Sequence, residues 1–372
     1  MHTPISKKRL MERIDFKKYI IISPESKTIF FERPLFMQTE MYVLNEFLNF
    51  YYENYRDYKI IYSEKGEYIT PGHILQLFQL HEFFLEKKIN TKKIIIFYEN
   101  KTKEYENLLG YLQFTFYYYP FNFYWATPDE FFVEEFELPK NFNKKFISFN
   151  KTKKEHRCNL EKLFEENNIK ENSYYSFRYN NNSNTFLEDD LNSSFCHHHS
   201  HLVPFYRDAF CNIVTETQYE SNVLSIDSVF ISEKTFRVLA SSRPFIIIGQ
   251  KHVLRNLHNL GFKTFNDIID ESYDDANDNV REKMIYQEIL KLNAKSNDEL
   301  YELWDKCRDI YRHNRQLLLN LAKHYESNFK DLFPKEFDIM FDIYFQSIQR
   351  ISNIPLWESL YHPQEYPKIE NN

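Results

Sequence analysis

The sequence predicts an α/β protein, built as two α/β halves followed by C-terminal helices. Short β-like runs alternate with helix-like stretches between Tyr19 and Ile94, and this alternation is typical of sheets with helical connections. A second series of the same kind begins near residue 145. The chain has 372 residues and no evident internal repeat, which favours two domains over one small core. We therefore predict three parts: residues 1–140, 141–330 and 331–372.

The first half begins with two β-like runs, KYIIIS and YKIIYS, each followed by a helix-like stretch, over residues 39–55 and 73–88. In the second stretch, apolar side chains recur at helical spacing. The run KKIIIFYEN then predicts an apolar strand of the kind that is buried on both faces of a parallel sheet. The first half therefore has the pattern of a parallel α/β unit.

Residues 112–126, LQFTFYYYPFNFYWA, are rich in aromatic side chains. They would suit an acceptor platform or a patch on a membrane surface, but large aromatic side chains are more often buried. We therefore expect a pair of core strands joined by a turn that contains proline, and we assign no function to them. The polar, proline-flanked residues 127–145 predict a linker into the second half.

The second half predicts a strand, a polar turn and a helix over residues 144–168, and further strands at YYSFRY and AFCNIVTET. FISEKTFRVLA predicts a strand that enters a helix, and PFIIIG predicts a central strand. A short helix follows, closed by Gly261. The pattern is helical over residues 278–325, and FDIMFDIYFQSIQRI predicts a last amphipathic helix.

Charge and glycine content limit the kinds of ligand. The net charge is −7 and the pI is about 6.0, so the whole chain has no global attraction for polyphosphate, and long nucleic acid is a less favoured main partner. A small anionic ligand stays open. The chain has five glycines, none spaced as GxGxxG or as a Walker loop. Side chains and helix N-termini would therefore have to hold any phosphates.

The four cysteines show no CxxC spacing, which predicts free thiols in a reducing compartment. The first residues, MHTPISKKRLMERIDF, lack the apolar segment of a signal peptide, and no apolar run reaches the ~18 residues that cross a bilayer. We therefore expect a soluble, cytoplasmic protein without a membrane span, located in the host cytoplasm if its source is viral. The sequence does not indicate an oligomeric state.

The run CHHHSH, Cys196 to His201, is the obvious candidate for a metal site. Neighbouring histidines in a polar loop rarely all face one ion, and no carboxylate or second CxxC completes a tetrahedral set of ligands. We therefore expect no metal there. GxSxG and HExxH are also absent, so a hydrolase lacks its nucleophile and a zinc protease lacks its ligands.

The turn NKTKKEHR, residues 150–157, places Lys151, Lys153, Lys154 and Arg157 between a predicted strand and a predicted helix. The first N–H groups of a helix lack partners and its dipole end is positive, so added cations would suit a pyrophosphate. Arg157 could bind phosphate oxygens through two N–H groups. A solvated basic face is an equally good interpretation.

Two further positions could bind a ligand. Glu216, in AFCNIVTET, lies at the end of a predicted strand and could accept hydrogen bonds from sugar hydroxyls, or it could cap a helix or face solvent. In FISEKTF, Ser232 is a plausible N-cap and Glu233 complements the helix dipole, whereas Lys234 opposes it. A bound phosphate would explain Lys234, and a solvated helix start is the alternative.

The order of the segments FISFNKTKKEHR, FCNIVTET, FISEKTF and RPFIIIG resembles the α1,3-fucosyltransferase family and related bacterial and viral glycosyltransferases. The resemblance covers residues 145 to about 325, and LRNLHNLGFKTFNDIIDESYDD is similar to an extension in phage and viral members. It implies a GT-B fold, in which two Rossmann-like domains face a cleft. Residues 141–330 would then be the nucleotide-sugar donor domain and residues 1–140 the acceptor-side domain.

The resemblance also implies an inverting, metal-independent transfer of a sugar from a nucleotide-diphosphate sugar to a glycan hydroxyl. It implies no cofactor besides the donor, for which a GDP-sugar is one candidate. Arg157 and Lys234 would bind the donor pyrophosphate, Glu233 the ribose, and Glu216 the donor sugar. We place Lys153 and Ser232 beside them as donor-binding residues.

Inverting transfer needs a base for the acceptor hydroxyl, and a carboxylate suits that role. Glu99, in IIIFYEN, loosely resembles the family's Gly-Glu-Asn acid, with Tyr98 in the place of glycine. Glu64 and Asp129 are alternatives. The family's pattern has Asn where this chain has Thr217, and such departures bear on the sugar more than on the reaction.

Two other functions fit the same residues. The basic turn and the phage-like extension would suit a viral DNA-modifying glycosyltransferase that acts on a hydroxylated base, and the protein would then bind DNA. A non-catalytic glycan-binding protein could also retain this fold, because intact donor-binding residues do not require turnover.

Overall fold

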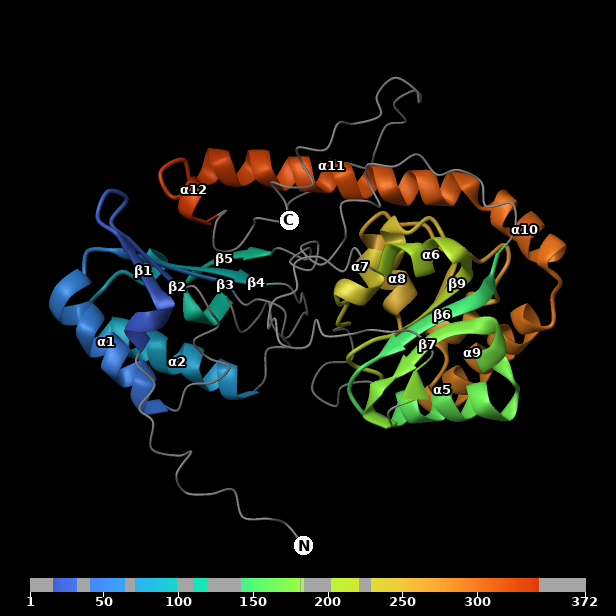
Figure 1. Cartoon of the computed structure of the whole chain (residues 1–372). Coiled ribbons are helices and arrows are strands. Elements are labelled where there is room, and N and C mark those ends of the chain that lie inside the picture. The colour runs from blue at the N-terminus through green and yellow to red at the C-terminus, as the bar shows by residue number, and fades with distance from the viewer. Residues whose placement is uncertain are drawn as a thin grey trace, which may run out of the picture. The chain divides into compact units, whose positions relative to one another are not determined.

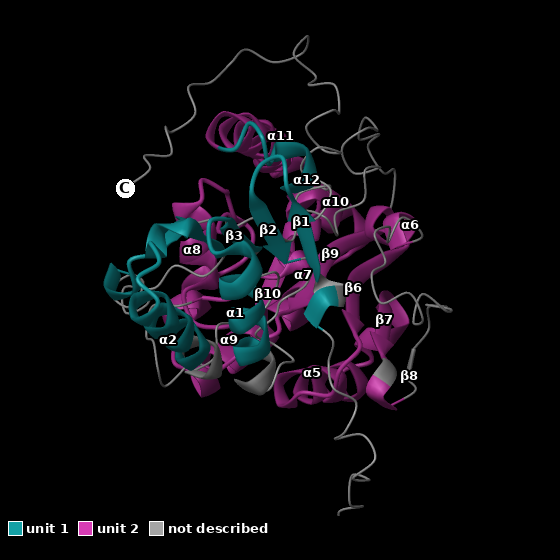
Figure 2. Cartoon of the chain, turned by 90° about the vertical axis from the view of Figure 1, so that its left-hand side faces the viewer, with its two compact units in different colours: residues 1–122, 333–344 teal, residues 123–332, 345–372 magenta. Residues whose placement is uncertain are grey.

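In the computed structural model, residues 16–31, 41–63, 71–98, 110–118, 142–180, 182–183, 202–220 and 229–340 are described. The chain divides into two compact units (Figures 1 and 2). Unit 1 consists of residues 1–122 and 333–344, and unit 2 consists of residues 123–332 and 345–372. The domain boundary that the sequence predicts, between residues 140 and 141, lies outside the described residues. None of the described helices is long and apolar enough to span a membrane.

Unit 1 contains a five-stranded sheet in the order β1-β2-β3-β4-β5. The first two strands pair antiparallel as a hairpin, and the others add in parallel. Two helices connect parallel neighbours and lie on one side of the sheet in Figure 1. The elements are β1 (Ile20–Ser23), β2 (Thr28–Phe31), α1 (Met41–Tyr55), β3 (Lys59–Ser63), α2 (Pro71–Glu86), β4 (Ile94–Tyr98) and β5 (Thr115–Tyr118).

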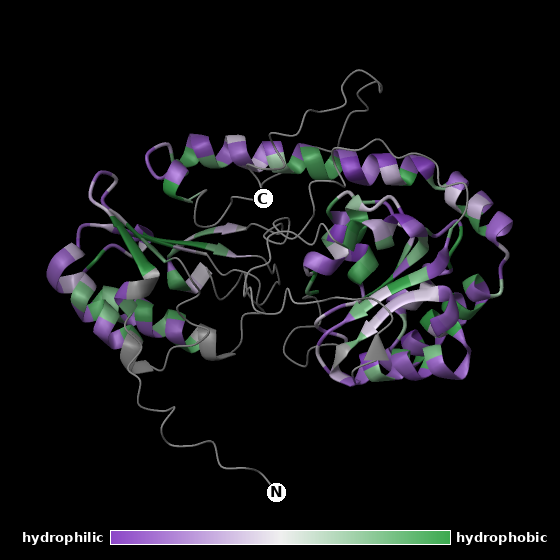
Figure 3. Cartoon of the chain, in the orientation of Figure 1, coloured by the Kyte–Doolittle hydropathy of each residue, from purple (hydrophilic) through white to green (hydrophobic). Residues whose placement is uncertain are grey.

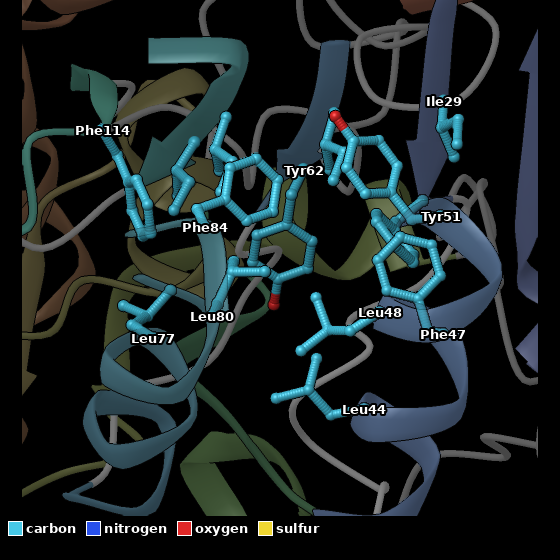
Figure 4. Close-up of a cluster of buried hydrophobic side chains, with 14 of the residues drawn as sticks. Ile29, Leu44, Phe47, Leu48, Tyr51, Tyr62, Leu77, Leu80, Phe84 and Phe114 are labelled. Atoms are coloured by element: carbon cyan, nitrogen blue, oxygen red, sulfur yellow. The ribbon is translucent and has the colours of Figure 1, made fainter. Parts of the chain in front are cut away.

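The core of unit 1 lies between this sheet and its two helices. Alternate residues of the strands point toward α1 and α2 and pack against their inner faces (Figure 4). Aromatic rings fill much of the space, and the Phe84 ring stacks on that of Tyr51 with centroids 5.4 Å apart. Figure 3 shows the same strands as the most hydrophobic part of the unit. Unit 1 is therefore stabilised mainly by burial of apolar surface.

The opposite face of this sheet is covered by the segment that follows α11. Phe333 packs edge-on against Phe97, with ring centroids 5.8 Å apart. Glu336, only 3% exposed, accepts a hydrogen bond from Lys59 Nζ at 2.6 Å. The short helix α12 (Phe337–Met340) begins one residue later. Residues near the C-terminus thus complete the core of the N-terminal unit.

Unit 2 contains a second five-stranded sheet in the order β10-β9-β6-β7-β8, and only β8 is antiparallel. The strands are β6 (Lys144–Asn150), β7 (Ser173–Phe177), β8 (Asn182–Ser183), β9 (Ala209–Thr215) and β10 (Phe245–Ile248). The helices are α5 (Glu155–Glu166), α6 (Val203–Asp208), α7 (Glu233–Ala240), α8 (Val253–Asn259), α9 (Asp278–Asn293), α10 (Asn297–Lys306) and α11 (Arg308–Leu332).

The strand order of unit 2 reverses between β6 and β9. From β6 the chain moves through α5 to β7 on one side, and it later returns to β9 and β10 on the other side. In open α/β sheets, ligands bind at the carboxyl edge where the order reverses in this way. Both units are therefore α/β structures with mainly parallel, Rossmann-like sheets, and C-terminal helices follow the second sheet, as the sequence predicts.

Candidate functional site

The carboxyl ends of β6 and β9 are joined by buried polar side chains. Thr215, the last residue of β9, donates from Oγ1 to Oδ1 of Asn150, the last residue of β6. The Asn150 amide in turn donates to Ser148 Oγ at 3.1 Å. All three side chains are about 2% exposed. These bonds fix the two strand ends, and therefore the two helix starts that follow them, relative to each other.

Glu216 follows β9 and is completely buried. Its Oε1 accepts from the Ser232 N–H at 3.0 Å and from the Thr235 hydroxyl at 2.5 Å, and its Oε2 accepts from the Thr217 N–H at 3.1 Å. A Cβ at Gly249 would lie 3.3 Å from the Cβ of Glu216, so glycine leaves the space that this side chain needs. The carboxylate therefore ties the end of β9 to the start of α7.

The start of α7 presents an ion pair. Ser232 is the N-cap, as predicted, and its hydroxyl accepts from the Lys234 N–H. Lys234 Nζ lies 3.3 Å from Glu233 Oε1 and donates to Ser232 Oγ at 2.9 Å and to Thr217 Oγ1 at 3.3 Å. Burial acts to raise the pKa of Glu233, but Lys234 and Arg237 together hold that pKa below its ordinary value. The Glu233 carboxyl group is therefore ionised at neutral pH.

The start of α5 supplies a second ammonium group to the same place. Lys154, the N-cap of α5, makes no side-chain capping hydrogen bond within the described residues. Its Nζ instead donates to Thr217 O at 2.5 Å. Thr217 thus receives hydrogen bonds from Lys154 and Lys234, which belong to two different helix starts. Lys151 and Lys153, in the preceding turn, are exposed.

Arg157 lies beneath these lysines and is 4% exposed. Its guanidinium donates to Thr152 O at 3.0 Å and to the carbonyls of Thr215 and Glu216 at 3.3 Å. Its Nε has no hydrogen-bond acceptor among the residues that the structure describes. Burial lowers the pKa of Arg157, and the Glu216 carboxylate acts against that shift. Arg157 therefore adds a buried positive charge behind the two helix starts.

His156 precedes Arg157 and was not singled out by the sequence. Its Nε2 lies 3.1 Å from Glu216 O, and its ring stacks on Tyr219. Burial, followed by the charge of Arg157, lowers the pKa of His156 to about 4. The imidazole is therefore neutral at pH 7, and because a carbonyl only accepts, Nε2 carries the proton that it donates. His156 directly precedes Arg157 in the first turn of α5, and this position could have identified it from the sequence as a residue of the site.

The start of α8 differs from the starts of α5 and α7. The Asp274 carboxylate accepts from the N–H groups of Leu254 and Arg255, both at 3.0 Å. A carboxylate from the protein thus already occupies the position where an anion would bind. An added anion is favoured at α5 and α7, where ammonium groups and a buried guanidinium face the helix starts.

The structure therefore brings together Arg157, Glu216, Ser232, Glu233 and Lys234, and it places Lys153 nearby on the exposed turn. The predicted base Glu99 and its alternatives Glu64 and Asp129 lie outside the described residues, as do Cys196 to His201. Within the described part of the chain, no group of three or more His, Cys, Asp or Glu side chains could hold a metal ion.

Comparisons with known proteins give one similar structure. No protein-family model matches the chain, and no curated protein matches it. The similar structure is that of a mutant of T4 phage BGT, a β-glucosyltransferase, in complex with UDP-glucose. It is 12% identical, covers 76% of this chain and 75% of the phage chain, and has a TM-score of 0.34.

Proposed function

We propose that unit 2 binds the diphosphate of a nucleotide-sugar donor at the starts of α5 and α7, and that the protein is a glycosyltransferase. The observation that carries this proposal is the convergence of Lys154 and Lys234 on Thr217, with Arg157 buried beneath. Two helix starts and three cations at one sheet edge form a site for a multiply charged anion. The chain has no glycine loop of a phosphate-binding kind, and these cations and helix starts support a diphosphate site in its place.

The chemistry follows from the charges. An acceptor hydroxyl oxygen attacks the anomeric carbon of the sugar, and the bond from that carbon to the diphosphate oxygen breaks. The electron pair leaves with the nucleoside diphosphate, where Lys154, Arg157 and Lys234 stabilise the developing negative charge. A carboxylate base takes the hydroxyl proton. We retain Glu99 as that base, with Glu64 and Asp129 as alternatives.

The contacts of Glu216 suggest a role other than the sugar contact that the family resemblance implies. Its carboxylate oxygens already accept three hydrogen bonds from the protein, and the residue is completely buried. We assign Glu216 to positioning α7, so that Lys234 faces the diphosphate. Glu233 is partly exposed beside Lys234, and its carboxylate is free to accept hydrogen bonds from ribose hydroxyls when Lys234 turns to the phosphate.

In this proposal, lysine and arginine side chains stabilise the leaving group, the role that a divalent metal has in other transferases. Lys153, Lys154, Arg157 and Lys234 outnumber the carboxylates of Glu216 and Glu233, and this excess of positive charge supports binding of a nucleoside diphosphate. We therefore propose a metal-independent transfer. The resemblance to the α1,3-fucosyltransferase family further implies an inverting transfer, a glycan acceptor and a donor such as a GDP-sugar, and we retain these in the proposal.

Donor binding is tested by calorimetry with GDP, UDP and dTDP on the full chain. We expect one of them to bind, and Lys234→Ala to weaken that binding by at least about tenfold, the effect of one lost charge-assisted hydrogen bond. Lys170→Ala is a matched control, because Lys170 is also partly buried and ion-paired, 2.6 Å from Glu165, and lies in the 3-10 helix Ile169–Asn172 beyond the C-terminal end of α5. Absence of binding by all three nucleotides, or equal effects of the two variants, would overturn the donor site.

Turnover is tested separately by incubating the protein with the donor that binds and with acceptors of two classes, oligosaccharides and DNA that contains a hydroxymethylated base. Mass spectrometry of the acceptor and assay of the released nucleoside diphosphate identify the product. Transfer to the oligosaccharide supports the proposal, and transfer to DNA alone assigns the protein to the DNA-modifying class. Donor binding without transfer to either would instead indicate a binding protein.

A further inference from the structure

Three stacked side chains lie beside the proposed diphosphate site: Arg281 from α9, Tyr219 from the segment after β9, and His156 from α5. The Arg281 guanidinium carbon lies 4.6 Å from the centre of the Tyr219 ring. The Tyr219 ring in turn stacks on the His156 ring, with centroids 5.3 Å apart and planes 21° apart. Arg281 and His156 are 1% and 5% exposed. The stack therefore links α9 to the start of α5 through the protein interior.

Tyr219 is held by the first turn of α9 at three points. Arg281 Nη2 donates to the Tyr219 carbonyl at 2.8 Å, and the guanidinium covers the ring. The Tyr219 hydroxyl donates to Asp278 O at 2.7 Å. Arg281 is itself fixed by the Asp278 carboxylate at 2.8 Å and by Ala276 O at 3.3 Å. Carbonyl, ring and hydroxyl of one residue are thus all restrained.

The restraint extends to the residues that contact the proposed ligand. Tyr219 lies two residues after Thr217, the point at which Lys154 and Lys234 converge. His156, packed on the Tyr219 ring, donates to Glu216 O. Segment 216–219 is therefore fixed from α9 at one end and from α5 along its side.

A buried guanidinium is a costly way to fill space. Removing such an ion from water is unfavourable even after relaxation, and an apolar side chain of similar volume is often the more stable choice. The planar guanidinium of Arg281, however, can hold two parts of Tyr219 at once: its N–H groups bind the carbonyl, and its flat face lies over the ring. The geometry of Arg281 is thus suited to fixing a segment in one place.

We propose that Arg281 is a positioning residue for the diphosphate site, acting through Tyr219 and His156 on segment 216–219. Arg281 would touch neither the ligand nor the reacting atoms. The inference rests on the proposed function of this site, because a positioning role has meaning only if segment 216–219 binds the diphosphate.

The test compares two buried arginines at opposite ends of β9. Arg281→Lys retains the charge but loses the planar fork. Arg243→Lys is the matched control, since Arg243 is 2% exposed, donates to Ala209 O at 3.1 Å and lies 5.5 Å from the Trp304 ring centroid. Ala209 begins β9, at the edge of the sheet away from the site. We expect both variants to lower thermal stability, and only Arg281→Lys to weaken GDP, UDP or dTDP binding, by about tenfold or more.

A second readout follows His156 by NMR, with His156→Gln identifying its imidazole signal. In Arg281→Lys we expect the imidazole to titrate at higher pH than in the wild type, because the Tyr219 ring no longer covers it. In Arg243→Lys we expect the titration to be unchanged. If Arg281→Lys does not fold, Tyr219→Leu and Tyr219→Phe replace it. Tyr219→Leu removes the stack, so it should weaken diphosphate binding and raise the pH at which His156 titrates. Tyr219→Phe keeps the ring and should retain diphosphate affinity within a few-fold.

The outcomes separate this inference from the proposed function. If the wild type binds none of the three diphosphates, the proposed function fails and the positioning role fails with it. If the wild type binds and Arg281→Lys binds as well as Arg243→Lys does, only the positioning role is overturned. An unchanged titration of His156 in the Arg281 and Tyr219→Leu variants would also overturn it.

Discussion

The two units bury different kinds of side chain. In unit 1 the described core between the sheet and its helices is apolar and aromatic, with Phe84 and Tyr51 stacked at its centre. In unit 2 the carboxyl edge of the sheet buries a glutamate, an arginine and a histidine within two adjacent turns: Glu216, Arg157 and His156. Buried charge costs free energy that apolar packing does not. The edge of unit 2 therefore has a geometry that stability alone does not explain.

This contrast predicts how substitutions will behave. A substitution in the core of unit 1 should change the free energy of unfolding and leave ligand binding by unit 2 unchanged. A substitution at the carboxyl edge of unit 2 should change both. Hydrogen exchange measured by mass spectrometry can follow each unit separately, because peptides from each report their own opening free energy.

Phe84→Ala should have the largest effect on stability. Phe84 is completely buried, and its loss removes apolar contact and leaves a cavity. We expect the opening free energy of α2 and β4 to fall by about 3–5 kcal/mol, with donor affinity unchanged. The neighbouring Leu85→Ala is the control, since Leu85 is 47% exposed and should cost about 0.5 kcal/mol or less. Equal effects at the two positions would contradict the assigned core.

The pH dependence of unit 2 should show the burial of His156. Its pKa is about 4 in the folded state and 6.5 ordinarily, so the unfolded chain binds more protons between these values. The unfolding free energy should therefore fall as the pH drops from 6.5 to 4, by a total of about 3 kcal/mol from this residue. His156→Gln should remove this part of the slope and change stability little at pH 8. Identical slopes in urea titrations of the two proteins would show that His156 is not buried in neutral form.

Thr235→Val should have a smaller effect, and it tests whether Glu216 sets the position of α7. Valine keeps the shape but leaves Glu216 Oε1 without the hydroxyl that donates at 2.5 Å. We expect a loss of about 1–3 kcal/mol in unit 2 together with weaker donor binding. Thr264→Val is the control, because Thr264 is also buried, at 4% exposed against 0% for Thr235, and donates to the Glu271 side chain at 2.5 Å, away from the site. Equal losses of donor affinity in the two variants would contradict the role of Glu216.

The sequence predicted most elements of the fold because their patterns are local. The apolar run of β4 and the helical spacing of α2 need only neighbouring residues to be recognised. Strand β2 was not predicted, since Thr28–Phe31 is four residues long and becomes a strand only by pairing with β1 and β3. The return of residues 333–344 to unit 1 was not predicted for the same reason, because it depends on contacts such as that of Glu336 with Lys59.

In the candidate site, too, features with a local sequence pattern were predicted and features that depend on distant contacts were not. Ser232 was recognisable as an N-cap from its place before Glu233 and Lys234. The buried orientation of the Glu216 carboxylate was not, because its donors Ser232 and Thr235 lie 16 and 19 residues further along the chain. Arg281 has no local signal at all, since its partner Tyr219 is 62 residues away and the pair meets only in the folded sheet edge.

Lys59→Met should have the smallest effect and tests how the C-terminal segment is attached to unit 1. It removes the ammonium group 2.6 Å from Glu336 and leaves that buried carboxylate with only the Thr28 hydroxyl, at 3.4 Å, among its described donors. The Lys59 side chain is 45% exposed, so water screens part of the interaction, and we expect a loss of about 1 kcal/mol. Peptides covering residues 333–340 should exchange faster, while α2 should change little.

Two controls test whether the ion pair causes this change. In 1 M salt the Debye length is about 3 Å, so the difference in exchange between Lys59→Met and the wild type should shrink. Adding Glu336→Gln to Lys59→Met should restore part of the protection against exchange. Unchanged exchange in residues 333–340 would mean that apolar contacts such as that of Phe333 with Phe97 hold the segment without help from the ion pair.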